Sequence, residues 1–307
     1  MTTQHLTGPV SAPRQVPFFI VGAQRSGTTM LRLMLNSHSK LSVPFESGFV
    51  VDFYRRRAEY GDLGLRDNAA RMLDDIARDP LAQKGALISD TQTILNYEFA
   101  SYAGLVDAIF SEHARHNGKV RWGDKTPSYA TEIGVLDALF PDCKIVHIVR
   151  DGRDVAMSNR SVDWGIQNLP RAAADWAWKV TIARKVGEVL RDRYLELRYE
   201  DLVGAPETVL RSVCAFLGEG FESTMLEYSK TAEQEMPAQS LQWHQNSIRA
   251  PDASLIQAWR RRMSMSDQII FNREAGETLR DFGYDGDRLP ANALSRLKYA
   301  YYMLFKR

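Results

Sequence analysis

The chain has 307 residues, 44% of them hydrophobic and 25% charged, which is ordinary for a globular protein with a buried core. Lys and Arg total 39 against 38 Asp and Glu, and this net charge of +1 excludes a general attraction to nucleic acid. No apolar run reaches the roughly 18 residues that cross a bilayer. Because residues 1–16 are polar, we expect a disordered N-terminal arm and a cytoplasmic enzyme.

Residues 17–36 carry the strongest local signal. The run FFIV at 18–21 predicts a short strand buried on both faces. The sequence GAQRSG at 22–27 follows, and Thr28 then opens a run of strong helix formers. Such a junction of strand, tight loop and helix gathers unpaired N–H groups at the positive end of a helix dipole. It therefore predicts an anion site.

The glycine spacing fits the P-loop pattern GxxxxGK[ST], except that Thr28 replaces the lysine. An enzyme acting on nucleoside triphosphates uses that lysine on the β- and γ-phosphates, so its loss argues against such chemistry. The loop cation is Arg25 instead. Taken alone, these residues would also suit a glycine turn that only joins a strand to a helix.

The loop sequence RSGTT resembles the 5′-phosphosulfate-binding loop of sulfotransferases that use 3′-phosphoadenosine 5′-phosphosulfate (PAPS). This resemblance implies that the donor nucleotide is bound by Arg25, Ser26, Gly27, Thr28 and Thr29. Animal Golgi members of the family carry an N-terminal membrane anchor. Its absence here suggests a soluble form of the bacterial type.

Residues 41–45 predict a second short strand, and Glu46 follows it. The ligand crevice of an α/β sheet lies outside the carboxyl ends of the strands, so Glu46 can share a cleft with Arg25. Most loop glutamates are simply solvated. In the tyrosylprotein and related sulfotransferases, a Glu at this separation from the loop Arg is the catalytic base, and the resemblance gives that role to Glu46. Residues 49–116 predict mostly helices and part of the acceptor pocket.

The stretch GDKTP at 123–127 suits a helix start, with Thr126 as N-cap and Pro127 at the first helical position. A lysine just outside a helix N-terminus is unfavourable unless it meets an anion, so Lys125 is expected to face a ligand. Similar stretches in bacterial sulfotransferases place this lysine on the transferring sulfuryl group. The resemblance thus makes Lys125 catalytic, together with Arg25 and Glu46.

Residues 144–149 predict an interior parallel strand, and residues 151–158 predict a helix. This element resembles the 3′-phosphate-binding element of the family, which assigns Arg150 and Ser158 to that phosphate. Arginine suits the task because its planar fork can hold two phosphate oxygens. By itself, RDGRD would also fit a helix start rich in surface ion pairs.

The second half of the chain predicts a long helix at 171–190, a strand at 194–199 and helices at 206–217 and 267–282. The resemblance places Tyr199 near the adenine. It also likens residues 243–249 to a loop that closes over the nucleotide, which makes Arg249 a nucleotide-binding residue, although relatives often have a lysine near this position. Should Glu46 not be the base, the alternatives are His38, His147 and His244.

The tail at 294–307 mixes Tyr, Met, Leu and Phe with basic residues. It predicts a helix that docks on the core or rests on a membrane surface, and docking is favoured because one short helix anchors weakly.

Together these features predict an α/β, P-loop NTPase-like three-layer fold with a central, mostly parallel sheet. The expected parts are the arm at 1–16, a sulfotransferase domain at 17–290 and a C-terminal helix at 291–307. The expected reaction moves a sulfuryl group from PAPS, without a metal, to a hydroxyl of a carbohydrate, glycolipid or small metabolite, releasing 3′-phosphoadenosine 5′-phosphate (PAP). The alternatives are a P-loop small-molecule kinase that needs Mg²⁺ and a nucleotide-binding module without catalysis.

Overall fold

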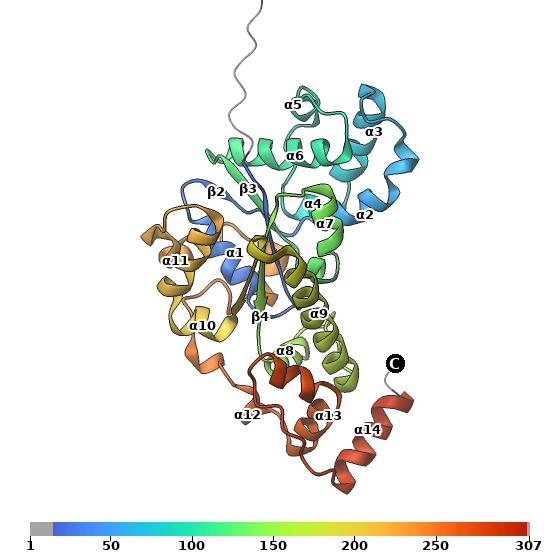
Figure 1. The fold of residues 1–307 in the computed structure, drawn as a ribbon, viewed down its shortest axis with the longest axis vertical. Coiled ribbons are helices and arrows are strands. Elements are labelled where there is room, and N and C mark those ends of the chain that lie inside the picture. The colour runs from blue at the N-terminus through green and yellow to red at the C-terminus, as the bar shows by residue number, and fades with distance from the viewer. Residues whose placement is uncertain (1–14, 306–307) are drawn as a thin grey trace, which may run out of the picture.

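The computed structural model describes residues 15–305 (Figure 1). Its centre is a sheet of five parallel strands in the order β2-β3-β1-β4-β5. The strands are β1 Phe18–Val21, β2 Leu41–Ser42, β3 Arg121–Lys125, β4 Lys144–Val149 and β5 Tyr194–Arg198. The arm predicted at 1–16 falls almost entirely outside the described residues.

Helices cover both faces of this sheet. The α-helices are α1 Thr28–Asn36, α2 Phe49–Arg56, α3 Arg66–Ala77, α4 Pro80–Lys84, α5 Thr91–Ile94, α6 Tyr102–His116, α7 Ile133–Leu139, α8 Gly152–Asn159, α9 Leu169–Leu190, α10 Tyr199–Gly204, α11 Pro206–Leu217, α12 Trp259–Arg262, α13 Met265–Asp281 and α14 Ala293–Phe305. Shorter 3₁₀ helices are η1 Arg57–Tyr60, η2 Pro127–Thr131, η3 Arg191–Arg193, η4 Ser223–Lys230, η5 Ala238–Trp243 and η6 Ala253–Leu255.

Strand β1 shows why the fold has three layers. Its four side chains are fully buried and alternate between the two faces of the sheet. Phe18 and Ile20 pack with α1, α10 and α11, whereas Phe19 and Val21 pack with α2, α6 and α9. Figure 1 shows these two groups of helices on opposite sides of the strands. The predicted α/β class, with a parallel central sheet buried on both faces, is confirmed.

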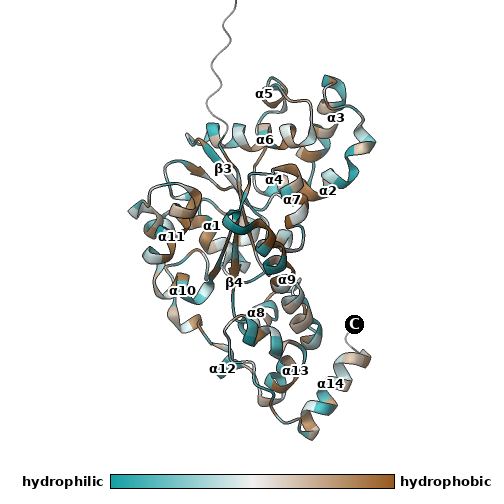
Figure 2. Ribbon diagram, in the orientation of Figure 1, coloured by the Kyte–Doolittle hydropathy of each residue, from teal (hydrophilic) through white to brown (hydrophobic). Residues whose placement is uncertain are grey.

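A third hydrophobic cluster lies beyond the carboxyl ends of β1 and β4. It joins α8, α9 and α13, and Tyr302 brings α14 against the same group. Figure 2 shows the apolar strand β4 at the centre of the molecule and α14 at its edge. Among the described residues, no helix is both long and apolar enough to span a membrane.

Two local predictions are corrected by the structure. The strand expected at 41–45 ends at Ser42, because Pro44 has no N–H for a ladder and the carbonyls of Val43 and Pro44 accept from Arg32 Nε at 2.8 and 3.3 Å. Thr126 and Pro127 occupy the predicted N-cap and first positions of the 3₁₀ helix η2, but the side chain of Thr126 makes no capping hydrogen bond. Its hydroxyl bonds Asp124 instead, and β3 continues through Lys125.

Candidate active site

All five strands end at the same edge of the sheet, and a predicted site residue lies at each end. These residues are Arg25 after β1, Glu46 after β2, Lys125 at the end of β3, Arg150 directly after β4 and Tyr199 directly after β5. Because the carboxyl ends of parallel strands border the ligand crevice, residues up to 174 positions apart in sequence are candidates for one site.

The loop at 22–27 is tightly packed against its neighbours. A Cβ on Gly22 would lie 2.5 Å from the carbonyl oxygen of Ile148, and a Cβ on Gly27 would lie 2.4 Å from the ring of Tyr199. Gly27 also has a φ of 93°, and Arg25 has a φ of 72°, both in the left-handed region. Helix α1 has neither a side-chain cap nor an acidic residue in its first turn. Its first N–H groups are therefore left for an anion.

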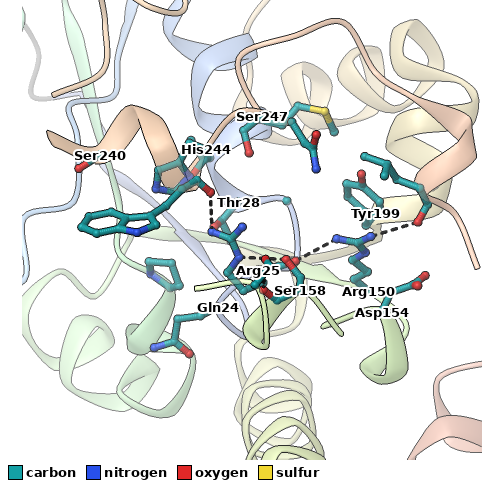
Figure 3. Close-up of a pocket in the computed structure, with 18 of the residues that line it drawn as sticks. Gln24, Arg25, Thr28, Arg150, Asp154, Ser158, Tyr199, Ser240, His244 and Ser247 are labelled. Carbon is teal, nitrogen blue, oxygen red and sulfur yellow. Dashed lines mark hydrogen bonds between the residues drawn. The ribbon is translucent and has the colours of Figure 1, made fainter. Parts of the chain in front are cut away.

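Arg25 joins this loop to two distant segments (Figure 3). Its Nε donates to Ser158 Oγ at 3.0 Å, and its Nη1 donates to the carbonyl of Trp243 at 2.9 Å. Arg150 reaches the same place from the end of β4. Its Nη1 donates to the carbonyl of Arg25 at 3.2 Å and its Nη2 to the carbonyl of Leu255 at 3.1 Å. The predicted 5′- and 3′-phosphate elements thus meet.

The two guanidinium groups are not neutralised by a carboxylate. Within residues 15–305, neither Arg25 nor Arg150 forms an ion pair. Burial lowers the pKa of Arg25, the nearby Arg150 lowers it further, and Glu46 opposes both effects. Two buried polar atoms here, Ser26 Oγ and Arg150 Nε, also have no hydrogen-bond partner. Such a group of unsatisfied donors favours a multiply charged anion.

A second pair of charged residues reaches the same cavity through Glu46. Lys125 Nζ donates to Glu46 Oε1 at 2.6 Å and to Thr29 Oγ1 at 3.4 Å, and it lies 5.0 Å from the ring centroid of Phe45. Burial lowers the pKa of Lys125, and Glu46 opposes that effect. Lys125 is 0% exposed and lies behind Glu46, which is 25% exposed and lines the cavity.

Adjacent residues of β3 hold adjacent residues of the loop after β2. Lys125 bonds Glu46, and Asp124 accepts from Ser47 Oγ at 2.8 Å. Thr126 Oγ1 donates to Asp124 at 3.3 Å and accepts from the backbone N–H of Ser47 at 3.3 Å. Burial raises the pKa of Asp124 to about 7, although Ser47 and Lys125 oppose the rise. This network fixes the backbone that carries Glu46.

The cavity between these groups has a volume of about 410 Å³, within the usual range for a small-molecule site. Tyr199 lines it beneath the guanidinium of Arg150, which lies 4.3 Å from the ring centroid. The predicted closing loop at 243–249 covers part of it through Trp243, His244, Asn246 and Ser247. Arg249 does not line the cavity. It is exposed, and its carbonyl accepts from the hydroxyl of Tyr228.

The structure adds wall residues that the sequence reasoning did not identify: Gln24, Leu81, Lys84, Asp154, Trp164, Leu255 and Arg262. Trp164 is 49% exposed in an irregular segment, where no periodicity marks a functional residue. Arg262 ends the short helix that begins at Trp259. Burial raises the pKa of Asp154 to about 6, and Arg150 opposes the rise.

Only one of the three histidines considered as alternative bases lines the cavity. His38 Nε2 lies 2.8 Å from the carbonyl oxygen of Gly220, and the fully buried His147 has Nδ1 2.6 Å from Tyr194 Oη. His244 does line the cavity, but burial and then neighbouring cations lower its pKa to about 3. Between residues 15 and 305, no group of three or more His, Cys, Asp or Glu is placed to hold a metal ion.

Comparison with known proteins gives a consistent family. The model of the "Sulfotransferase family" matches residues 17–223, a range that contains Arg25, Glu46, Lys125, Arg150 and Tyr199. An uncharacterized protein of Aquifex aeolicus is 26% identical over 264 residues, covering 81% of this chain and 31% of that protein. Protein-tyrosine sulfotransferase 2 of Gallus gallus is 26% identical over 219 residues, covering 69% of this chain and 53% of that protein. The chain thus spans about a third to a half of their lengths.

The fold has solved counterparts. The sulfotransferase domain of the Synechococcus PCC 7002 olefin synthase superposes with a TM-score of 0.59 and 25% identity, covering 94% of this chain and all of that domain.

Proposed function

Because this chain belongs to the sulfotransferase family, we propose that it transfers a sulfuryl group from PAPS to an acceptor hydroxyl and releases PAP. The observation that carries the proposal is the meeting of Arg25, Ser158 and Arg150 in one cavity that also contains Glu46. This cavity thus offers two arginines that form no ion pair within residues 15–305, which suit a nucleotide with two anionic groups, and it also offers a carboxylate.

The residues of the loop and of α8 fit the donor. The first N–H groups of α1, the buried Ser26 hydroxyl and the guanidinium of Arg25 would hold the 5′-phosphosulfate. Arg150 and Ser158 would hold the 3′-phosphate, and Tyr199, beneath Arg150, would contact the adenine. When bound, PAPS supplies the sulfuryl group, and its 5′-phosphate oxygen is the leaving group.

Glu46 is the proposed general base. Its Oε1 accepts from Lys125, which leaves Oε2 to take the proton of an acceptor hydroxyl. Lys125 would orient this carboxylate through their hydrogen bond, so we assign it a positioning role rather than contact with the transferring group. His244 is a weaker candidate, because its pKa of about 3 makes the imidazole a poor proton acceptor at neutral pH.

We propose a carbohydrate, glycolipid or small metabolite as the carrier of the acceptor hydroxyl. Support comes from the aromatic side chains of the cavity wall, since sugar and ring faces stack on such side chains. Trp164 and Trp243 lie 6.3 Å apart between ring centroids, and Phe45 and His244 also lie 6.3 Å apart.

Thermal-shift measurements with PAP and with ATP plus Mg²⁺ test the donor. We expect PAP to raise the Tm, because a ligand that binds only the folded state stabilises it. We then expect release of PAP from PAPS to depend on an added hydroxyl acceptor. A Tm increase with ATP and Mg²⁺ alone, accompanied by ATP turnover that a chelator stops, would establish a kinase instead. Binding of PAP without transfer to any acceptor would establish a module that has lost catalysis.

A further inference from the structure

Helix α14 packs on the rest of the protein through Tyr302, which joins the third hydrophobic cluster, and through several polar contacts. The guanidinium of Arg160 donates to Tyr302 Oη at 2.6 Å, and Asn168 Nδ2 donates to the carbonyl of Tyr302 at 3.0 Å. On α13, Asp267 forms an ion pair with Lys298 at 2.8 Å. Tyr302 is 5% exposed and Ser295 is 2% exposed, so these residues mark the docked face.

The opposite face of α14 is apolar and exposed. Leu294 is 64% exposed, Leu297 70%, Tyr301 50% and Leu304 70%. Their spacing of three, four and three residues places them on one stripe of the helix. A surface helix normally buries its apolar stripe and exposes its polar one, and α14 does the reverse. Figure 1 shows α14 at the edge of the molecule, where it contacts α13 and α9.

Positive charge accompanies this stripe. Residues 288–307 contain no Asp or Glu, and their basic residues are Arg288, Arg296, Lys298, Lys306 and Arg307. The whole chain has a net charge of only +1, so this concentration is local. Two acidic side chains of α13, Asp267 and Glu274, contact α14, but they meet Lys298 and Tyr299 on or beside its docked face. They therefore do not neutralise the outward face.

We propose that the outward face of α14 docks on an anionic lipid surface. A helix that combines an apolar stripe, aromatic residues and flanking basic residues lies in the plane of a lipid interface, with its stripe among the acyl chains. A second copy of this chain fits less well. A two-fold contact would bring the same patch of each copy together and oppose basic residues with basic residues.

Vesicle flotation of the full chain tests this proposal without depending on its activity. We expect the protein to float with vesicles of phosphatidylcholine and phosphatidylglycerol, and much less with phosphatidylcholine alone. The double variant L297Q/L304Q keeps the charge and alters only exposed side chains. We expect its partition coefficient on the mixed vesicles to fall by about tenfold or more.

A matched control is V120Q/V189Q, which changes two other exposed apolar residues, 65% and 78% exposed, outside α14. It should float like the unmodified protein. Arg296→Gln should lower the partition coefficient by about fivefold at low salt. Circular dichroism would verify that each variant keeps its helices.

Failure of the unmodified protein to float, or equal flotation of L297Q/L304Q, would overturn the proposal. Equal flotation with both vesicle types would show that α14 binds lipid without a preference for anionic headgroups, and would overturn that part of the proposal. Concentration-dependent dimers that L297Q/L304Q abolishes in the absence of lipid would assign the face to a second copy instead.

Discussion

The cavity has two groups of charged residues that differ in their ion pairing: Arg25 and Arg150, called the arginine side below, and the pair of Lys125 and Glu46. On one side, the guanidinium groups of Arg25 and Arg150 bond only hydroxyl and carbonyl oxygens, with no ion pair among the described residues. On the other side, the fully buried Lys125 is paired with Glu46 at 2.6 Å. The two arginines are half-buried and Lys125 is fully buried, but among the described residues only Lys125 has an ion-pair partner.

This difference indicates what each side is built to meet. Cations that are partly withdrawn from water and have no counter-ion are stabilised when a ligand supplies the negative charge, so the arginine side is suited to a ligand with two anionic groups. The carboxylate of Glu46 is held by Lys125 through one oxygen and has the other oxygen left for a proton. The comparison therefore separates nucleotide binding from proton transfer, and the following changes test that separation.

The largest expected effect belongs to Glu46→Gln. The substitution keeps an acceptor for Lys125 but removes the base, so we expect kcat to fall by about 10²- to 10⁴-fold. The affinity for PAP should stay within about threefold, since Glu46 is not part of the arginine side. Steady-state release of PAP and titration calorimetry measure the two quantities. An equal loss of both would show that the two sides act as one unit.

Asp124→Asn tests the network behind Glu46. Burial raises the pKa of Asp124 from 3.8 to about 7, so the folded state binds its proton more tightly than the unfolded state. The resulting stability is fully present below about pH 4 and is lost as the pH rises through 7. The unfolding free energy of the native protein, minus that of the variant, should therefore fall by up to about 4 kcal/mol over this range. Urea titrations at several pH values measure it, and a constant difference would show that folding leaves the pKa of Asp124 unchanged.

Arg150→Ala tests the arginine side. Hydrogen bonds from a charged group contribute about 1.5–3 kcal/mol, so we expect PAP to bind about 10- to 100-fold more weakly. The affinity for adenosine 5′-monophosphate, which has no 3′-phosphate, should change little in this variant. A similar loss for both nucleotides would mean that Arg150 holds another part of the ligand.

Arg249→Ala is the matched control for that measurement. Arg249 is exposed and does not line the cavity, so the affinity for PAP should change by less than about twofold. A loss comparable to that of Arg150→Ala would instead support the nucleotide contact that the family resemblance assigned to it.

The smallest expected effect on turnover belongs to His244→Asn. With a pKa of about 3, His244 is neutral over the working range, so its loss should change kcat by less than about tenfold. The pH profile of kcat/KM should keep its shape. If the acidic limb of this pH profile disappeared in the variant, His244 rather than Glu46 would be the general base.

Local features of the site could be predicted because they depend on short stretches of sequence. The apolar run at 18–21, the glycines of the loop and the helix formers after Thr28 require their observed conformations whatever surrounds them. The strand at 144–149 and the following helix are equally local. Their order along the chain also implied a parallel sheet, whose shared carboxyl edge collects the site residues.

Errors arose where one segment depends on a distant one. The strand at 41–45 was predicted too long because Pro44 and the Arg32 side chain decide where its ladder stops. The side chain of Thr126 was predicted to cap the following helix. Its hydroxyl bonds Asp124 and the N–H of Ser47 instead, and a local sequence pattern does not reveal that Ser47 lies nearby.

The sequence by itself determined the elements of this protein, the anion loop and the side chains available for catalysis, because backbone propensity and hydrophobic alternation act over a few residues. Only the tertiary structure decided that Arg25 meets Ser158, that Lys125 lies behind Glu46 and that α14 turns its apolar stripe outward. These three arrangements depend on which distant segments pack together. Packing then determines which charged side chains form ion pairs and which are left to bind a ligand.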